Sequence, residues 1–155
     1  MQSGDLFIGV FIRHQKIGRT FIEWPLHVTI VSWARGAAEP QVLLAALERE
    51  LRSTKAFSVK VGPETLFSDG RVLVNEITDA KSLHNLIDIY EKVKEVENKL
   101  GYRFVSTLHP RYRPHVTVQP LDRLHSGDEF DVRSLAVIEQ KGNHKEIIGE
   151  VGLRA

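Results

Sequence analysis

The sequence predicts an α+β fold: two pseudo-symmetric lobes of antiparallel sheet with helices on the outside and a central cleft. Strand-like segments outnumber helical ones and do not alternate with them one for one, which argues against a doubly wound parallel sheet. One tetrapeptide pattern also occurs twice, which indicates an internal duplication. The length of 155 residues suits a single domain, and no low-complexity segment or long linker divides residues 1–155.

The composition is that of a globular chain, and it excludes several functions. The 21 basic and 20 acidic residues nearly balance, so the protein does not grip a nucleic-acid duplex through overall charge. The absence of cysteine excludes disulfides, cysteine nucleophiles, thiolate zinc sites and iron–sulfur clusters. The apolar run from Leu6 to Ile12 follows no basic residue and is too short to span a bilayer. These features predict a cytoplasmic protein that is not associated with a membrane.

The first third of the chain predicts two strands and a helix. Residues Leu6–Arg13 are β-branched and aromatic, which favours a buried strand, and a polar loop with a turn at Gly18 follows. Residues Leu26–Trp33 alternate in polarity and predict a second strand. Pro40 suits the first turn of a helix whose apolar stripe is formed by Leu43, Leu44, Leu47 and Leu51.

The middle of the chain predicts two more strands and a longer helix. Residues 57–61 alternate in polarity up to the Gly62–Pro63 break, and Val72–Ile77 follows a turn at Asp69–Gly70. Asp79 is a suitable N-cap for the helix, and Gly101 suits its C-terminal end. The predicted apolar face of this helix consists of Leu83, Leu86, Ile87, Tyr90 and Val93.

Three further strands are predicted near the C-terminus. They are His115–Val118, Phe130–Gln140 and Lys145–Leu153. The turn residues Lys141–Asn143 indicate that the last two form a hairpin.

The repeated tetrapeptides carry the chemistry. His27–Ile30 and His115–Val118 share the pattern His, apolar, Thr, apolar, and their histidines are 88 positions apart. In a strand, side chains two positions apart point to the same face, so each His and Thr lie on one side and the apolar residues on the other. If the two polar faces meet, two imidazoles and two hydroxyls converge on one cleft.

That set of groups suits phosphoryl transfer without a metal. A neutral imidazole can remove a proton from an attacking oxygen, and a protonated imidazole can give one to the leaving oxygen. The hydroxyls of Thr29 and Thr117 can donate hydrogen bonds to the non-bridging phosphate oxygens and hold the phosphorus in line. A single His-x-Thr in a strand is more typical of a structural pair, but a second copy in matching surroundings favours function.

The doubled motif resembles the 2H phosphoesterase superfamily, and within it the 2′-5′ RNA ligase-like or RNA 2′,3′-cyclic phosphodiesterase branch. The resemblance extends over nearly the whole chain and implies a bilobal fold with both motifs in a central cleft. It also implies that His27 and His115 are the catalytic pair and that Thr29 and Thr117 bind phosphate. In the hydrolytic direction it implies that His115 activates water and that His27 protonates the leaving 3′ oxygen.

The sequence departs from this family in two respects. Many relatives place an arginine soon after the second motif, whereas Gln119 and Pro120 stand there and Arg123 is the first arginine to follow. The chain is also short for this branch, so loops that grip a long RNA are not expected. A small nucleotide or another cyclic phosphate therefore remains an alternative substrate, and both hydrolysis and ligation stay open.

Three further residues are predicted to bind substrate. Tyr112 and Arg113 lie just before the second motif, where Arg113 offers a planar fork to phosphate and Tyr112 a ring or hydroxyl. Trp24 lies three residues before His27 and is a candidate base-stacking platform, although core packing is as good an interpretation.

The sequence shows no signature of a cofactor or metal. It has no Gly-rich phosphate loop, no His-x-His and no His-Glu-x-x-His, so neither a cofactor nor a metal is expected. The expected partner is a nucleotide or RNA end with a cyclic or 2′-linked phosphate, and no obligate protein partner is evident. Two alternatives to the enzyme stay open: a non-catalytic nucleotide or RNA-end binding module, and a structural domain in which both tetrapeptides are core pairs.

Overall fold

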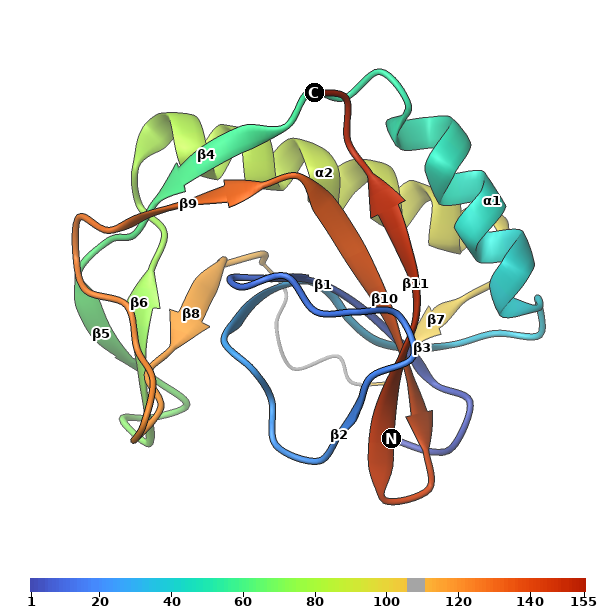
Figure 1. The fold of residues 1–155 in the computed structure, drawn as a ribbon, viewed down its shortest axis with the longest axis horizontal. Coiled ribbons are helices and arrows are strands. Elements are labelled where there is room, and N and C mark those ends of the chain that lie inside the picture. Colours follow the sequence, from blue (N-terminus) through green and yellow to red (C-terminus); the bar gives the residue numbers. More distant parts are fainter. Residues whose placement is uncertain (106–110) are drawn as a thin grey trace.

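The computed structural model of the chain describes residues 1–105 and 111–155. It contains a nine-stranded sheet, a separate two-stranded ribbon and two helices (Figure 1). All the strand pairs in both sheets are antiparallel, which confirms the predicted α+β class. Along the large sheet the strands are β2 (Thr20–Phe21), β11 (His144–Gly152), β10 (Ser134–Lys141), β1 (Leu6–Phe11), β3 (His27–Arg35), β8 (His115–Thr117), β6 (Val72–Glu76) and β5 (Glu64–Phe67), with β7 (Arg103–Phe104) also on β3.

The two halves of the large sheet meet where the repeated tetrapeptides lie. Strands β3 and β8 are antiparallel neighbours, and Val28 lies opposite Val116. These two valines occupy the same position in the two copies of the motif. An antiparallel pair with equivalent residues opposite each other has a local two-fold axis between them, so the site has the pseudo-symmetry that the repeat predicts.

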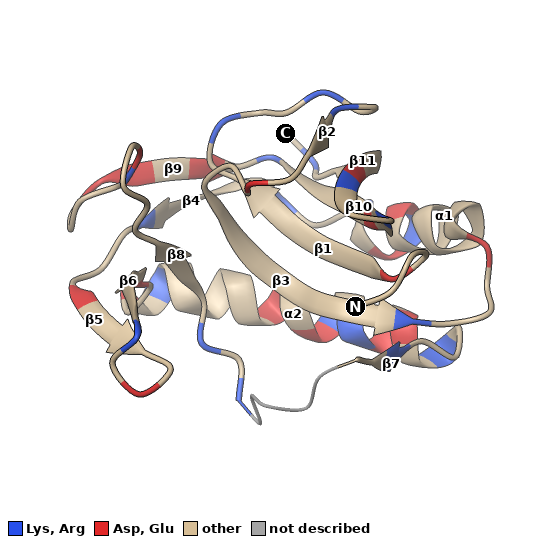
Figure 2. Cartoon of the chain, turned by 90° about the horizontal axis from the view of Figure 1, so that it is seen from below, with Lys and Arg blue, Asp and Glu red and all other residues tan. Residues whose placement is uncertain are grey.

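Both helices cover the same face of the sheet. They are α1 (Pro40–Leu51) and α2 (Ala80–Lys99), and both lie behind the sheet in the view of Figure 2. Helix α1 begins with proline, as predicted, and buries Leu43, Leu47 and Leu51 completely.

The ends of α2 are as predicted, and its buried face is so only in part. The Asp79 carboxylate accepts a hydrogen bond from the Ser82 N–H, and the helix ends before Gly101, whose φ is +83°. The predicted face was partly wrong, because Leu83 and Ile87 lie at the margin of the contact. The buried apolar residues of the helix are Leu86, Ile89, Val93 and Val96.

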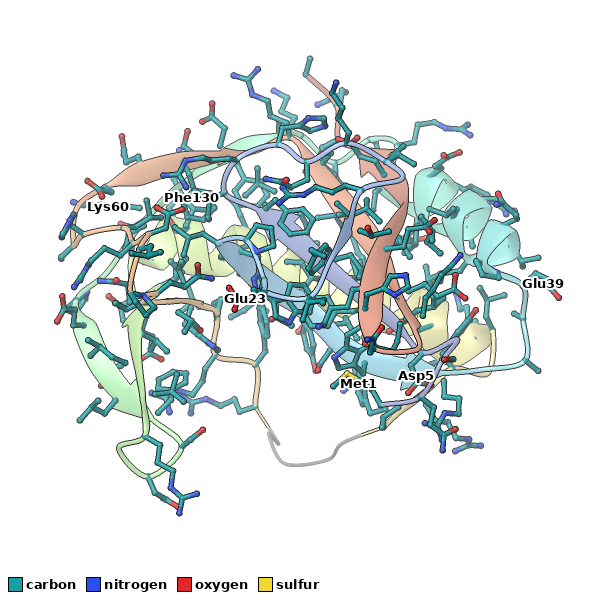
Figure 3. The ribbon with its side chains drawn as sticks, turned by 60° about the horizontal axis from the view of Figure 1, so that its bottom comes forward. Met1, Asp5, Glu23, Glu39, Lys60 and Phe130 are labelled. Atoms are coloured by element: carbon teal, nitrogen blue, oxygen red, sulfur yellow. The ribbon has the colours of Figure 1, made fainter. Side chains whose placement is uncertain are left out.

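The main core lies between these helices and the sheet. The apolar members of the motif strands belong to it: Val28 is 0% exposed and Ile30 and Val116 are 1% exposed. A smaller aromatic cluster covers the other, helix-free face, from which side chains rise toward the viewer in Figure 3. We define it by Phe7, Phe21, Trp33, Ala136, Ile138 and Ile147, with Phe11 and Trp24 packed against it.

The C-terminal strands correct one prediction. The segment Phe130–Gln140 is not one strand but two, β9 (Glu129–Val132) and β10, which separate at Arg133. The reason is a change of partner, since β9 pairs with β4 (Phe57–Lys60) outside the main sheet while β10 pairs with β1 and β11. The predicted hairpin between β10 and β11 is confirmed, with Gly142 in its turn at φ +63°.

In the described part of the chain, no helix is both long and apolar enough to cross a membrane.

Candidate active site

The two motifs place their polar side chains on the helix-free face. His27 and Thr29 of β3 are half-buried, as are His115 and Thr117 of β8, while the valine between each pair is fully buried. Because side chains alternate along a strand, all four polar groups point away from the helices. The prediction that each His and Thr share one face, opposite their apolar neighbours, is therefore confirmed.

The register brings each histidine next to the other motif's threonine. Since Val28 faces Val116 in an antiparallel pair, His27 lies across from Thr117, and His115 lies across from Thr29. Directly opposite Cβ atoms in such pairs are about 4.5–5.5 Å apart and diagonal ones about 7–8 Å. Two imidazoles and two hydroxyls thus occupy a patch about the size of one phosphate with its ester oxygens.

Both imidazole rings are oriented by the same backbone contact. His27 Nδ1 lies 2.9 Å from the Pro25 carbonyl oxygen, and His115 Nδ1 lies 2.8 Å from the Arg113 carbonyl oxygen. A carbonyl can only accept, so Nδ1 carries the hydrogen in each ring. Nε2 is then the nitrogen that takes up or releases a proton, and the short lead-in before each motif fixes this tautomer.

His27 lies against the aromatic cluster. Its ring centroid is 4.4 Å from that of Trp24, 5.8 Å from Phe7 and 6.5 Å from Phe11. This burial lowers the pKa of His27 below its ordinary value. The hydrogen bond to the Pro25 carbonyl acts in the opposite direction, and the charge of His115 lowers the pKa further. At neutral pH the neutral imidazole is therefore the favoured state of His27 in the free protein.

His115 has a different neighbourhood. Its ring centroid is 4.7 Å from that of Phe67, which comes from β5. The Arg113 guanidinium lies 4.2 Å from the Phe67 centroid and makes two hydrogen bonds, of 2.9 and 3.0 Å, to the Glu76 carboxylate. Glu76 is the residue of β6 directly opposite His115. An ion pair thus borders His115, whereas aromatic rings surround His27.

Residues 12–130 match the family model of the 2′-5′ RNA ligase superfamily. The chain belongs to this superfamily. Membership indicates a phosphoesterase-type function. A comparison with the curated proteins finds no match.

Solved structures share the whole fold of this superfamily member at low sequence identity. A structure of TT0787 from Thermus thermophilus has a TM-score of 0.69 and 19% identity over 97% of this chain and 98% of its own. Escherichia coli LigT in complex with 3′-AMP has a TM-score of 0.64 and 12% identity over 99% and 100%. A third structure, described as a phosphoesterase, has a TM-score of 0.65 and 14% identity over 99% and 100%.

The three supporting residues of this 2′-5′ RNA ligase superfamily member all lie beside the motifs. Trp24 contacts His27 and also packs on Phe7 and Phe21, with ring centroids 4.6 and 5.1 Å away. Arg113 borders His115 through its contacts with Glu76 and Phe67. Both therefore lie at the site, and each is already in contact with neighbouring side chains.

Tyr112 makes contacts that differ from those expected of a substrate ligand. Its hydroxyl donates a 2.9 Å hydrogen bond to the Thr29 carbonyl oxygen, and its ring stacks on Tyr90 with centroids 4.4 Å apart. Burial raises the pKa of this phenol well above its ordinary value, and Tyr90 contributes to the shift. The side chain fixes the strand that carries Thr29.

Sequence reasoning missed three residues of the site. Phe67 and Glu76 come from β5 and β6, and their proximity to His115 follows from strand order, which no local pattern reveals. Gln119 was noticed only as a departure from the family. Its side-chain amide donates a 2.8 Å hydrogen bond to the Trp24 carbonyl oxygen and so ties the exit of the second motif to the lead-in of the first.

Two further charged or titratable side chains pair with carboxylates away from the motif residues. Arg123 pairs with Glu64, and His14 lies 3.1 Å from Glu150. His109 lies outside the described residues. Across residues 1–105 and 111–155, no group of three or more His, Asp or Glu side chains is arranged to hold a metal ion.

Proposed function

We propose that this protein is a metal-independent phosphodiesterase that hydrolyses a 2′,3′-cyclic or 2′-linked phosphodiester of a nucleotide or RNA end. The observation that carries the proposal is the Val28–Val116 register, because it sets two His-x-Thr pairs around one point on the helix-free face. Two imidazoles in the same tautomer on either side of a phosphate supply an acid and a base at once. Family membership supports the same class of chemistry.

The threonines hold the substrate in this proposal. The hydroxyls of Thr29 and Thr117 donate hydrogen bonds to the two non-bridging oxygens of the phosphodiester and lie on opposite sides of the local two-fold axis. This arrangement keeps the attacking and leaving oxygens in line with the two Nε2 atoms. A β-branched threonine suits the task because its χ1 angle has little freedom in a strand.

The chemical step is one displacement at phosphorus. His115 Nε2 removes a proton from water as its oxygen bonds to phosphorus. The bond from phosphorus to the 3′ oxygen breaks, and His27 Nε2 delivers a proton to that oxygen, which leaves a 2′-phosphate and a 3′-hydroxyl. His27 must be protonated for this role, and the negative phosphodiester offsets the burial that lowers its pKa.

The test is turnover of 2′,3′-cyclic mononucleotides in excess EDTA by the wild type and by the His27→Ala/His115→Ala double variant. We expect the wild type to produce the 2′-phosphate and the double variant to be inactive. His125→Ala/His144→Ala is the matched control, because both of these histidines lie outside the site. If the cyclic nucleotide binds but is recovered unchanged, the protein is a binding module and the enzyme proposal is wrong.

A second substrate assigns the roles of the two histidines. The second substrate is a phosphodiester with a p-nitrophenyl group. Its p-nitrophenolate leaves without needing a proton, so the reaction bypasses the general acid. We expect His27→Ala to retain most activity on this substrate and His115→Ala to lose it. The reverse pattern would exchange the two roles and leave the pairing intact.

A further inference from the structure

Arg113 contacts the second motif twice, once through its backbone and once through its side chain. His115 Nδ1 donates a 2.8 Å hydrogen bond to the Arg113 carbonyl oxygen, and the Arg113 guanidinium donates two hydrogen bonds to the Glu76 carboxylate. The carbonyl that fixes the tautomer of His115 is therefore anchored through the side chain of the same residue.

The sheet register places Glu76 for this contact. Glu76 lies directly opposite His115 in the β6–β8 pair, so both side chains rise from the helix-free face. Its Oε2 atom accepts a hydrogen bond from Arg113 Nε at 2.9 Å, and its Oε1 atom accepts one from Arg113 Nη2 at 3.0 Å. A two-point contact of this kind fixes the direction of the planar guanidinium as well as its distance.

Phe67 completes the arrangement from the next strand. The centroid of its ring lies 4.2 Å from the Arg113 guanidinium carbon and 4.7 Å from the centroid of the His115 ring. The guanidinium and the imidazole therefore pack on the same aromatic ring, and a guanidinium is well suited to such packing. A shift of the Arg113 side chain would disturb the packing of His115 as well.

The backbone next to the Arg113 carbonyl is also held. Arg113 precedes Pro114, and a residue before proline favours an extended conformation. The Pro114 carbonyl oxygen accepts a 2.9 Å hydrogen bond from the N–H of Ile77, the residue that follows Glu76. The segment Glu76–Ile77 therefore holds the lead-in of the second motif at two successive points, one through a side chain and one through the backbone.

These contacts bear on the prediction that Arg113 binds phosphate. The Nε and Nη2 atoms face Glu76, so the fork that would match two phosphate oxygens is occupied. The carboxylate also offsets the positive charge that would attract a phosphodiester. Both bonds would have to break before this fork turned to a substrate, whereas a role in holding His115 needs no rearrangement.

We propose that Glu76 is a positioning residue for His115, that it acts through Arg113 and Phe67, and that Arg113 serves the histidine instead of the phosphate. Glu76 holds the guanidinium, which holds the Arg113 carbonyl. That carbonyl keeps hydrogen on Nδ1 of His115 and leaves Nε2 to the substrate. The effect on turnover rests on the proposed phosphodiesterase function, and the effect on the ring does not.

The first experiment observes the ring without turnover. Glu76→Gln replaces one carboxylate oxygen by an amide group that cannot accept a bond from the guanidinium. NMR of the ring nitrogens, at a pH where His115 is neutral, shows which of the two carries the hydrogen. We expect hydrogen on Nδ1 in the wild type and a mixture of both tautomers in the variant.

Asp131→Asn is the matched control for this experiment. Asp131 is the carboxylate partner of Arg133 in an exposed ion pair of the β4–β9 ribbon, outside the main sheet. We expect the tautomer of His115 to stay the same in this variant. A His115 tautomer that is also unchanged in Glu76→Gln would overturn the proposal.

The second experiment separates positioning from phosphate binding. The double variant Glu76→Gln/Arg113→Met removes one negative and one positive charge, so the net charge beside His115 is unchanged. We expect kcat for a 2′,3′-cyclic mononucleotide to fall by about 3- to 10-fold, with KM and the Kd of inorganic phosphate unchanged. Glu76→Gln alone should lose as much kcat, because the two residues act as one unit.

The other possible results have different signatures. If Arg113 binds the phosphate, Glu76→Gln should release it and tighten the binding of inorganic phosphate, while the double variant should weaken that binding. This pattern would overturn the proposal. If the wild type did not turn over in EDTA, the proposed function would fail, but a tautomer mixture confined to the Glu76 variants would still support the role of Glu76 at the ring. Both side chains of the pair are partly exposed, so we expect the fold to persist, and thermal melting measures this.

Discussion

The two halves of the site share a backbone arrangement but differ in their surroundings. In each half a strand presents His and Thr on the helix-free face, and the Nδ1 atom contacts a carbonyl two residues earlier. An aromatic ring also packs on each imidazole, Trp24 on His27 and Phe67 on His115. The halves differ beyond that point, because His27 is enclosed by further aromatic rings whereas an Arg113–Glu76 ion pair borders His115.

This difference shows which parts of a duplicated site must stay equal. The backbone sets the strand register and the imidazole tautomer. Both must be the same in the two halves if each ring is to point its Nε2 atom at the same phosphate. The charge states must differ, since one ring gives a proton while the other takes one. Side chains from neighbouring strands make the two surroundings different without disturbing the register, and here they come from β1 on one side and from β5 and β6 on the other. Because burial lowers the pKa of His27, the negative phosphodiester has to supply the protonated state that the proposed acid needs.

Removal of either histidine is the strongest test of whether both halves of the site take part in the reaction. We expect His27→Ala and His115→Ala each to reduce kcat by about 10²- to 10⁴-fold, because each removes one proton-transfer partner. The double variant should lose little more than the worse single variant, since the two residues act as a unit. Steady-state kinetics in EDTA measures this, and thermal melting shows whether the fold persists. If the melting temperature instead falls sharply in both single variants, the tetrapeptides are structural pairs of the core.

The threonines test the symmetry of the phosphate contacts. Thr29→Val and Thr117→Val keep the shape of the side chain and remove only the hydroxyl, so we expect each to reduce kcat/KM by about 10- to 100-fold. Similar losses in the two variants would show that the phosphate lies on the local two-fold axis. A loss confined to one of them would mean that the phosphate is bound by one half alone. Thr65→Val in β5 is a control outside both motifs.

The repeated motif was the part of this site that the sequence could predict. Alternation within each tetrapeptide was enough to place His and Thr together on one face, and the doubling indicated the two-fold relation. The strand order β8–β6–β5 could not be predicted from the sequence, because Phe67 lies 48 positions before His115 and only the sheet brings them together. The division of Phe130–Gln140 was missed for a related reason, since apolar character continues across Arg133 while the pairing partner changes.

Gln119 joins the two halves, and its removal should have a moderate effect. Gln119→Leu eliminates the hydrogen bond to the Trp24 carbonyl and so loosens the segment that orients His27. We expect kcat to fall by about 3- to 10-fold with little change in KM, because the loss is one of positioning. Gln119→Glu cannot donate this bond and should behave similarly, so wild-type kinetics in both variants would contradict the role.

The electrostatic link between the histidines can be measured without turnover. His115→Gln removes a charge that lowers the pKa of His27, so the pKa of His27 should rise toward its ordinary value while burial keeps it below that value. Titration of the His27 ring signals by NMR measures the change. His144→Gln is the control, because it removes a half-buried histidine outside the site. An unchanged pKa of His27 in His115→Gln would mean that the two rings titrate independently.

The smallest effect on activity is expected at Glu97 in α2, on the side of the sheet away from the motifs. This carboxyl is 2% exposed and neither oxygen has a hydrogen-bond partner among the described residues, so burial raises its pKa to about 8. The folded state then holds a proton that the unfolded state releases near the ordinary value of 4.5. Stability should therefore fall as pH rises from that value toward 8, by at most about 1.4 kcal/mol per pH unit.

Glu97→Gln imitates the protonated carboxyl and so should flatten this pH dependence. Chemical denaturation at pH 5 and at pH 8 should give similar stabilities for wild type and variant at the lower pH and a more stable variant at the higher one. Catalytic constants should be unchanged, because Glu97 lies in the helix layer and the motif side chains point to the opposite face. A variant that altered both stability and the pH profile of turnover would show that the two faces of the sheet are coupled. The difference between His27 and His115 would then not be set by their immediate neighbours alone.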